Sequence, residues 1–330
     1  MRQRAIFALA SLLVALGIGA AEVAARPLSA TTGNDRFPVN ELLEGSESSA
    51  DQCASLPFAV WVIVDGKGDC IRYYAGGLKA GNPDMLIFFH GDRMALNGGS
   101  QRAIGSYERQ SPAGLERDAV LWSAQARGLP FLFVGRPGTH GSSGNHAERR
   151  RPREVKLMTA ALDAIKVRHG VQRYHLSGQS GGGHITGAML NMRQDIECAA
   201  IASGAVAVWK RVELLGGRSR DTTGYADPYD PAKEVSRIRR APPPRIFVLS
   251  DPQDRTVPFG SQEYYVSRLV EARLAPVHVL AIAPDTGRHA LAHLARPAIR
   301  WCAQGVPTDE IRRRLEEQGR RATTATETAD

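Results

Sequence analysis

The stretch that most constrains this chain is 174–183, where a short apolar strand meets Gly-Gln-Ser-Gly-Gly and a helix follows from His184. A serine that joins a strand directly to a helix stands on a very sharp turn, and the residues two positions away must lack a β-carbon. Gly178 and Gly182 meet this requirement around Ser180. Such a turn lifts the hydroxyl above the sheet and aims the helix N-terminus at it. Because glycine is common, these residues alone do not exclude an ordinary loop.

The rest of the chain alternates short apolar runs with stretches of helical period. The apolar runs predict strands at 85–89, 131–134, 174–177, 199–202, 245–250 and 277–282. The helical stretches are 112–127, 153–169, 184–190, 232–239, 262–273, 290–303 and 308–320. This alternation indicates an α/β fold, with a mostly parallel central sheet and helices on both faces. Two further apolar runs, 59–64 and 70–75, flank a turn and predict an N-terminal antiparallel hairpin.

Ligands of such a sheet bind beyond the carboxyl ends of its strands, so the loops after the strands carry the chemistry. Asp254 follows the strand that ends at residue 250, and His289 follows the strand that ends at residue 282. Together with Ser180 they follow three separate strands, in the order Ser, Asp, His. A histidine that removes the serine proton creates a nucleophile, and an aspartate holds the imidazole in the required tautomer.

From about residue 59 to residue 303 the chain resembles serine hydrolases of the α/β-hydrolase superfamily, in which the turn around the serine is the nucleophile elbow. The segment 250–258, Ser-Asp-Pro-Gln-Asp-Arg-Thr-Val-Pro, is similar to the motif of that fold whose aspartate, three residues before Val-Pro, is catalytic. That aspartate corresponds to Asp254. The elbow and the C-terminal third resemble prolyl-oligopeptidase-like enzymes and related esterases. At 90–92 the chain has His-Gly-Asp, where many of these enzymes have His-Gly-Gly-Pro.

The resemblance implies a role for each of these residues. Ser180 would be the nucleophile, His289 the general base and Asp254 the acid that orients the base. The backbone N–H groups of Gly181 and Asp92 would form the oxyanion hole. The residues that shape the elbow are Gly178, Gln179 and Gly182.

The acid and the base each have an alternative in the sequence, and the oxyanion hole contains an unexpected acidic residue. Asp251 ends its strand and is an alternative acid, although a role in capping the turn suits it better. His293, one helical turn beyond His289, is an alternative base. An acidic side chain at Asp92 would oppose a developing oxyanion unless it points away or is paired, and the neighbouring Arg93 is a candidate partner.

Further histidines lie in the loops around the predicted site. His140 and His146 follow the strand 131–134, and we expect them to be exposed, with a place in the pocket wall as the alternative. Their spacing does not support a metal site with His90, so we expect no metal and no cofactor. The loops 135–146 and 205–231 are expected to form the pocket walls.

The N-terminus predicts a secretory signal peptide at 1–25. Arg2 and Arg4 precede the uncharged apolar run 6–16, and small residues follow at 23–25. No later segment is long and apolar enough to span a bilayer. We therefore expect a periplasmic or secreted protein without stable membrane association after cleavage. The remaining segments are an irregular lead-in at 26–52, a single catalytic domain at 53–321 and a disordered tail at 322–330.

Four cysteines in an exported chain favour two disulfides, although four cysteines allow three pairings and buried free thiols are an alternative. Cys53 lies just before the hairpin and Cys70 lies within it. Cys198 begins a strand, and Cys302 lies far enough along the helix after His289 to reach the sheet edge opposite the predicted site. We therefore favour the pairs Cys53–Cys70 and Cys198–Cys302.

Arginine dominates the charge of this chain, which has a formal net charge of +8. Basic runs such as 149–151 and 312–314 contain no interleaved aromatic residues, so we expect solvated basic faces and no nucleic-acid partner, with attraction to anionic surfaces or substrates as the alternative.

The signal peptide predicts export, and the resemblance implies an enzyme that cleaves carboxylic ester or amide bonds in small ester or peptide substrates through an acyl-enzyme. A serine peptidase of the prolyl-oligopeptidase-like type is the second reading. A non-catalytic binding protein on a hydrolase fold is the third.

Overall fold

The computed structural model describes residues 26–327 apart from 80, 98, 99, 106, 218 and 240. This part of the chain is built around one mixed sheet of eight strands. Its strands, in spatial order, are β1 (Ala59–Val64), β2 (Lys67–Gly76), β6 (Phe131–Val134), β3 (Asp84–Phe89), β7 (Arg173–Gln179), β8 (Ile196–Ala202), β9 (Arg245–Ser250) and β10 (Val277–Leu280). From β6 to β10 all neighbours are parallel, whereas β1 pairs antiparallel with β2 and β2 with β6. The predicted α/β fold with its N-terminal hairpin is therefore confirmed.

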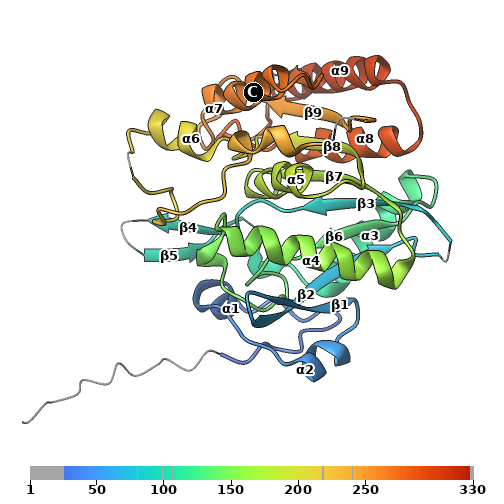
Figure 1. Ribbon diagram of the computed structural model, residues 1–330, viewed down its shortest axis with the longest axis vertical. Coiled ribbons are helices and arrows are strands. Elements are labelled where there is room, and N and C mark those ends of the chain that lie inside the picture. Colours follow the sequence, from blue (N-terminus) through green and yellow to red (C-terminus); the bar gives the residue numbers. More distant parts are fainter. Residues whose placement is uncertain are drawn as a thin grey trace, which may run out of the picture.

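Helices cover both faces of this sheet (Figure 1). The α-helices are α1 (Val39–Glu44), α2 (Ala50–Ser55), α3 (Pro112–Gln125), α4 (Pro152–His169), α5 (Gly181–Met192), α6 (Val208–Leu214), α7 (Phe259–Glu271), α8 (Ala292–Ala303) and α9 (Thr308–Glu327). Short 3-10 helices are η1 (Tyr107–Arg109), η2 (His146–Glu148), η3 (Pro231–Lys233) and η4 (Val235–Arg237). A separate hairpin consists of β4 (Met94–Asn97) and β5 (Ser100–Ala103).

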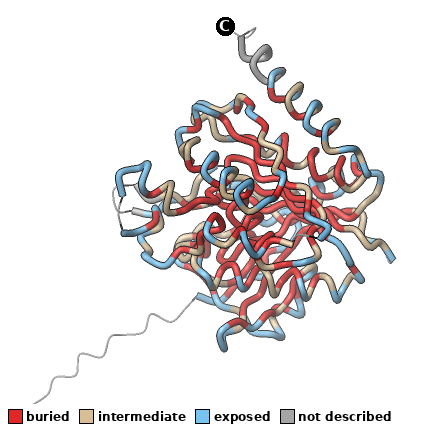
Figure 2. The backbone as a smooth tube through the Cα atoms, turned by 45° about the horizontal axis from the view of Figure 1, so that its top comes forward, coloured by how far each residue is buried: buried red, intermediate tan, exposed pale blue. Residues whose placement is uncertain are grey.

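Alternate residues of each central strand pack on opposite faces, which gives the molecule two hydrophobic layers. Leu176 of β7 belongs to the layer under α4, α5 and α7, whereas Ala200 of β8 belongs to the layer under α3, α8 and α9. Buried residues accordingly gather at the centre of the molecule and exposed residues at its periphery (Figure 2). Strands such as β6, Phe-Leu-Phe-Val, are apolar throughout because both of their faces are covered.

Several local elements differ from the sequence-based expectation. The lead-in contains α1 and α2, and Ser49 caps α2 by accepting a hydrogen bond from the backbone N–H of Gln52. The helix expected at 232–239 is instead the pair η3 and η4, separated by Glu234 with a non-helical φ of −110°. Neither α6 nor the β4–β5 hairpin was predicted. The last helix, α9, continues to Glu327 through much of the expected tail, and the predicted signal peptide lies outside the described residues.

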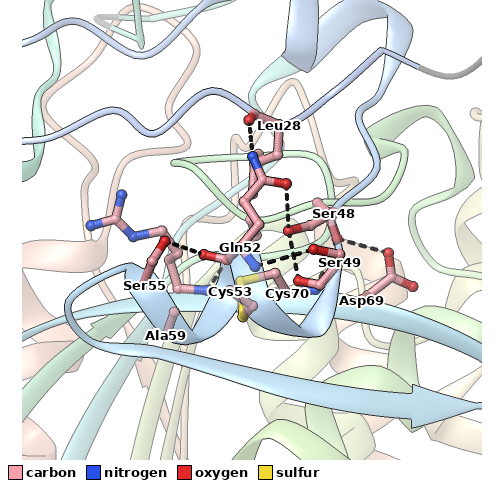
Figure 3. The surroundings of a disulfide bond; sticks show 12 residues. Leu28, Ser48, Ser49, Gln52, Cys53, Ser55, Ala59, Asp69 and Cys70 are labelled. Carbon is pink, nitrogen blue, oxygen red and sulfur yellow. Dashed lines mark hydrogen bonds between the residues drawn. A yellow bond between two sulfur atoms is a disulfide. The ribbon is translucent and has the colours of Figure 1, made fainter.

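Both favoured cysteine pairings are present. Cys53 of α2 bonds Cys70 of β2 across a Cα–Cα distance of 5.5 Å, and the neighbouring Gln52 donates to the carbonyl of Leu28 (Figure 3). Cys198 of β8 bonds Cys302 of α8, with a Cα–Cα distance of 6.4 Å. The first bond ties the lead-in to the hairpin, and the second ties α8 to the centre of the sheet. Among the described residues, no helix combines the length and apolarity that crossing a bilayer requires.

The two disulfides are expected to contribute unequally to stability, because they close chain loops of different length. The bond Cys198–Cys302 spans 104 residues and Cys53–Cys70 spans 17. Loss of loop-closure entropy in the unfolded chain predicts roughly 4–5 kcal/mol for the long loop and about 3 kcal/mol for the short one. Urea denaturation of the two Cys→Ala double variants without reductant measures this difference. An equal or reversed ranking would contradict it.

Candidate active site

Ser180 stands between the end of β7 and the first residue of α5, with φ of 56° and ψ of −116°. A positive φ is strained for any residue with a β-carbon and costs on the order of 1–3 kcal/mol. The turn is fixed by hydrogen bonds, because the N–H of Ser180 donates to the carbonyl of Ala202 at 2.8 Å and its carbonyl accepts from His184. The strand–turn–helix context predicted for this serine is therefore present.

The flanking glycines are required by close backbone packing. A β-carbon at Gly178 would lie 2.1 Å from the carbonyl oxygen of Gly182. A β-carbon at Gly182 would lie 2.0 Å from the carbonyl oxygen of Phe89 at the end of β3. Larger residues would push the helix away from the sheet, so the spacing of the two glycines has the steric origin inferred from the sequence.

Asp254 and His289 meet above the carboxyl ends of β9 and β10. Asp254 Oδ2 lies 2.8 Å from Nδ1 of His289, and the Asp254 side chain is fully buried. The carboxylate also accepts hydrogen bonds from the backbone N–H groups of Thr256 and Val257, at 2.8 and 2.9 Å. This arrangement places the proton of a neutral imidazole on Nδ1. Nε2 is then left as the acceptor, and it is buried without a hydrogen-bond partner among the described residues.

The alternative residues are placed differently. Asp251 binds Arg288 at 2.6 Å and accepts from the backbone N–H of Ala283, so it joins the turns after β9 and β10. His293 is exposed in the first turn of α8. The structure therefore brings Asp254, and not Asp251, to the imidazole of His289.

Two residues hold the main chain around His289, and sequence reasoning did not assign this role to either. The Gln179 side chain donates to the carbonyl of His289 at 2.7 Å and accepts from the N–H of Leu291 at 2.9 Å. The Asp285 carboxylate accepts from the N–H groups of His289 and Ala290, at 2.9 and 2.7 Å. The two Gln179 contacts join residues 110 and 112 positions apart in the sequence, and no local sequence pattern indicates them.

The loop after β3 faces the elbow. A β-carbon at Gly91 would lie 3.3 Å from Cβ of Ser180, and one at Gly181 would lie 2.0 Å from Oδ1 of Asp92. Gly91 therefore lies beside Ser180, and the Asp92 side chain lies beside Gly181, the residue that follows the serine. The Asp92 side chain is close to this point, so the state of its charge matters for any anion formed there.

Three arginines neutralise the Asp92 carboxylate, and Arg93 is not among them. Oδ1 lies 2.8 Å from Arg136, and Oδ2 lies 3.0 Å from Nε of Arg149 and also binds Arg150. Burial alone would raise the pKa of Asp92, but the charges of the three arginines hold it well below its usual value. The expected partner was wrong because the Asp92 side chain points across the loops to segments that are distant in sequence.

Two further carboxylates complete the buried ionic network. Glu154 lies 2.8 Å from Arg136, and Asp221 lies 2.8 Å from Nε of Arg150. The side chains of Arg136 and Arg150 are 0% and 2% exposed. The expectation of a solvated basic run at 149–151 is therefore wrong for residues 149 and 150, which are buried by these partners.

The histidines after β6 are also buried, contrary to expectation. Nδ1 of His140 lies 3.1 Å from Nε2 of His90, and His146 accepts from the N–H of Arg93 at 3.1 Å. Ser142 and Ser143 bind backbone N–H groups of β2, which folds this loop against the sheet. Burial lowers the pKa of all three histidines well below the usual value. Within the described residues, no group of three potential ligands could hold a metal ion.

A cavity of about 630 Å3 contains Ser180 and His289 in its wall. Its lining includes the aromatic rings of Phe88, Trp122 and Phe133. It also includes residues 205, 211 and 222, as expected for the segment 205–231. The loop 135–146 does not contribute, because it packs against β2, and α3 with the β3–β4 region takes its place.

Comparisons with known proteins show similarity in three dimensions. No family model and no curated protein sequence matches the chain. The uncomplexed acylaminoacyl peptidase of Pyrococcus horikoshii aligns with a TM-score of 0.50 and 12% identity, over 76% of this chain and 40% of that one. A putative dipeptidyl aminopeptidase IV from Bacteroides ovatus aligns with a TM-score of 0.52 and 15% identity, over 74% of this chain and 35% of that one.

A third similar structure is Est1E from Butyrivibrio proteoclasticus with bound ferulic acid, with a TM-score of 0.49 and 17% identity over 73% of this chain and 96% of that one. This chain spans 40% or less of the length of the two peptidases. The likeness to those two peptidases shows a common fold.

Stability should fall steeply in mild acid, because four histidines are buried and neutral. They are His90, His140, His146 and His184, and burial lowers the pKa of His184 to about 4. Below pH ~6.5 the unfolded chain protonates these side chains and the native protein does not, so the free energy of unfolding decreases as pH falls. Urea unfolding between pH 7.5 and 5 should reveal an uptake of about three to four protons near pH 5. A flat profile would contradict this assignment.

Replacing Asp92 with Asn should destabilise the protein by about 3–5 kcal/mol, since it leaves buried guanidinium groups uncompensated. The matched control is Asp227→Asn, which removes an ion pair to Arg151 in which the Asp227 side chain is 52% exposed. That change should cost less than about 1 kcal/mol. Urea denaturation of both variants at pH 7.5 measures the difference, and equal effects would show that the Asp92 network is not buried in solution.

Proposed function

We propose that this chain, which has the α/β-hydrolase fold, is an exported serine hydrolase that cleaves carboxylic esters through a covalent acyl-enzyme. The observation that carries the proposal is the convergence of three loops on one cavity. Ser180 on its strained turn and His289, paired with buried Asp254, both line that cavity.

In the proposed reaction, Nε2 of His289 accepts the proton of the Ser180 hydroxyl as its oxygen attacks the ester carbonyl. Asp254 stabilises the imidazolium that forms and keeps the ring oriented. The imidazolium then gives its proton to the leaving alcohol, and the acyl group stays on Ser180. A water molecule, activated by the same imidazole, attacks the acyl-enzyme and releases the carboxylic acid.

The backbone N–H groups of Gly181 and Asp92 would stabilise the oxyanion of the tetrahedral intermediate. Their position beside Ser180 supports this role, since Gly181 begins α5 and Asp92 follows Gly91 directly against the serine. Each such donor contributes about 3–4 kcal/mol to transition-state stabilisation. The three arginines around the Asp92 carboxylate offset its charge, which would otherwise oppose the oxyanion.

Two features support ester substrates and export. The cavity wall combines aromatic side chains with the nucleophile, and of its two described carboxylates, Asp92 and Asp118, the first is already bound by three arginines. Two disulfides are typical of proteins that fold in an oxidising compartment. A peptidase activity is the second candidate, because two of the similar structures are named as peptidases.

A fluorophosphonate probe tests the nucleophile directly. Wild type should be labelled, Ser180→Ala should not, and the exposed-serine control Ser267→Ala should be labelled like wild type. Hydrolysis of p-nitrophenyl butyrate by Ser180→Ala should fall by at least about 10⁴-fold, because no other residue supplies the nucleophile. Labelling of Ser180→Ala equal to wild type would refute the assignment, and an unlabelled wild type would favour a binding protein.

Aminoacyl p-nitroanilides decide between the two hydrolase activities. The ratio of kcat/KM for the p-nitrophenyl ester to kcat/KM for the anilide is compared with the ratio of their uncatalysed hydrolysis rates. A larger enzymatic ratio supports an esterase. Preferential cleavage of the anilides would show that the peptidase reading is right.

A further inference from the structure

Arg211 of α6 lines the same cavity as Ser180, and no described carboxylate forms an ion pair with it. Its guanidinium group donates to the hydroxyl of Thr222 at 2.9 Å and to the carbonyl of Thr256 at 3.1 Å. Both acceptors are neutral. Among the described residues, none of its nitrogens is within 4 Å of a carboxylate oxygen, and its Nε is buried without a hydrogen-bond partner.

In the neighbouring ionic network, every carboxylate is already paired with an arginine. Asp92, Glu154 and Asp221 together carry three negative charges, and three buried arginines bind them. Arg150 of that network shares the Thr222 hydroxyl with Arg211, so the two cations are adjacent. Burial, followed by the positive charge of Arg150, lowers the pKa of Arg211 to about 10, and the more distant carboxylates of Asp221, Asp92 and Asp254 offset this only in part, so Arg211 is charged at neutral pH.

Arg211 is partly buried in this cavity and has no ion-pair partner, and an anionic ligand would supply that partner. Arg211 is also close to the reaction centre. It binds the carbonyl of Thr256, whose N–H donates to the Asp254 carboxylate. The same cavity is lined by the rings of Phe88, Trp122 and Phe133, which suit a carbon skeleton.

We propose that Arg211 binds an anionic oxygen group of the substrate, so that the preferred esters carry a carboxylate or a phosphate a few carbon atoms from the scissile carbonyl. This inference rests on the proposed serine hydrolase function. A guanidinium group forms two parallel hydrogen bonds to either oxyanion, and these charged hydrogen bonds give selectivity over neutral esters.

A matched pair of substrates tests the proposal. Mono-p-nitrophenyl glutarate carries the anion, and its methyl ester, methyl p-nitrophenyl glutarate, has the same carbon skeleton without the charge. Wild type should prefer the anionic ester in kcat/KM by about tenfold or more. A preference for the neutral ester would overturn the proposal.

The variant Arg211→Gln should reduce the ratio of the two kcat/KM values by about 10- to 100-fold, and Arg211→Lys should retain part of the preference. The control is Lys210→Gln on the same helix, whose ammonium group binds Glu213 and does not line the cavity. It should keep the wild-type ratio. An unchanged ratio in Arg211→Gln, with normal fluorophosphonate labelling, would refute the role of Arg211.

Ligand binding separates this inference from the proposed catalysis. Glutarate and inorganic phosphate are titrated calorimetrically into Ser180→Ala and into Ser180→Ala with Arg211→Gln. Binding to Ser180→Ala that is lost in the double variant supports the anion site, even if wild type proves inactive. Comparison of the two dissociation constants then shows whether the site prefers a carboxylate or a phosphate. Binding of neither anion to Ser180→Ala, or equal binding to both proteins, would overturn the proposal. Near-ultraviolet circular dichroism confirms that the double variant is folded.

Discussion

The carboxylate of Asp92 joins the loops that surround the candidate active site. It follows β3 directly and binds arginines from the loop after β6 and from the residues before α4. Arg150 extends the network to Asp221, which lies beyond α6. Buried ionic hydrogen bonds are short and directional, and breaking one leaves an unpaired charge in the interior. Segments that are far apart in the sequence are therefore held in one arrangement around the elbow.

The proposed catalytic residues are positioned by two different physical means. Ser180 is placed by steric constraint, because the approach of α5 to β3 leaves room only for glycine at residue 182. His289 is placed by hydrogen bonds from three directions, with Asp254 on its ring and with Gln179 and Asp285 on its backbone. The steric constraint fixes the backbone conformation at Ser180, and the hydrogen bonds fix the position of the imidazole. Together they define where a substrate carbonyl can react.

The fold and the candidate triad could be predicted because their signals are local. A buried parallel strand is apolar at every position, a helix repeats its apolar residues every three to four, and a sharp turn needs its glycines. The buried arginines could not be recognised in this way. Arg149 and Arg150 look like part of a surface run, and only their distant partners Asp92 and Asp221 explain why they are inside. His140 and His146 were misplaced for the same reason.

The sequence by itself determined the α/β architecture and the positions of Ser180, Asp254 and His289 on loops at one end of the sheet, and it favoured the two cysteine pairs that the structure contains. The tertiary structure decided which charges neutralise each other, which residues hold His289, and that Arg211 is left without a carboxylate. The physical reason is the range of the interactions. Periodicity and turn sterics act over a few neighbouring residues, whereas charge balance in a buried cavity depends on side chains that folding brings together from distant parts of the chain.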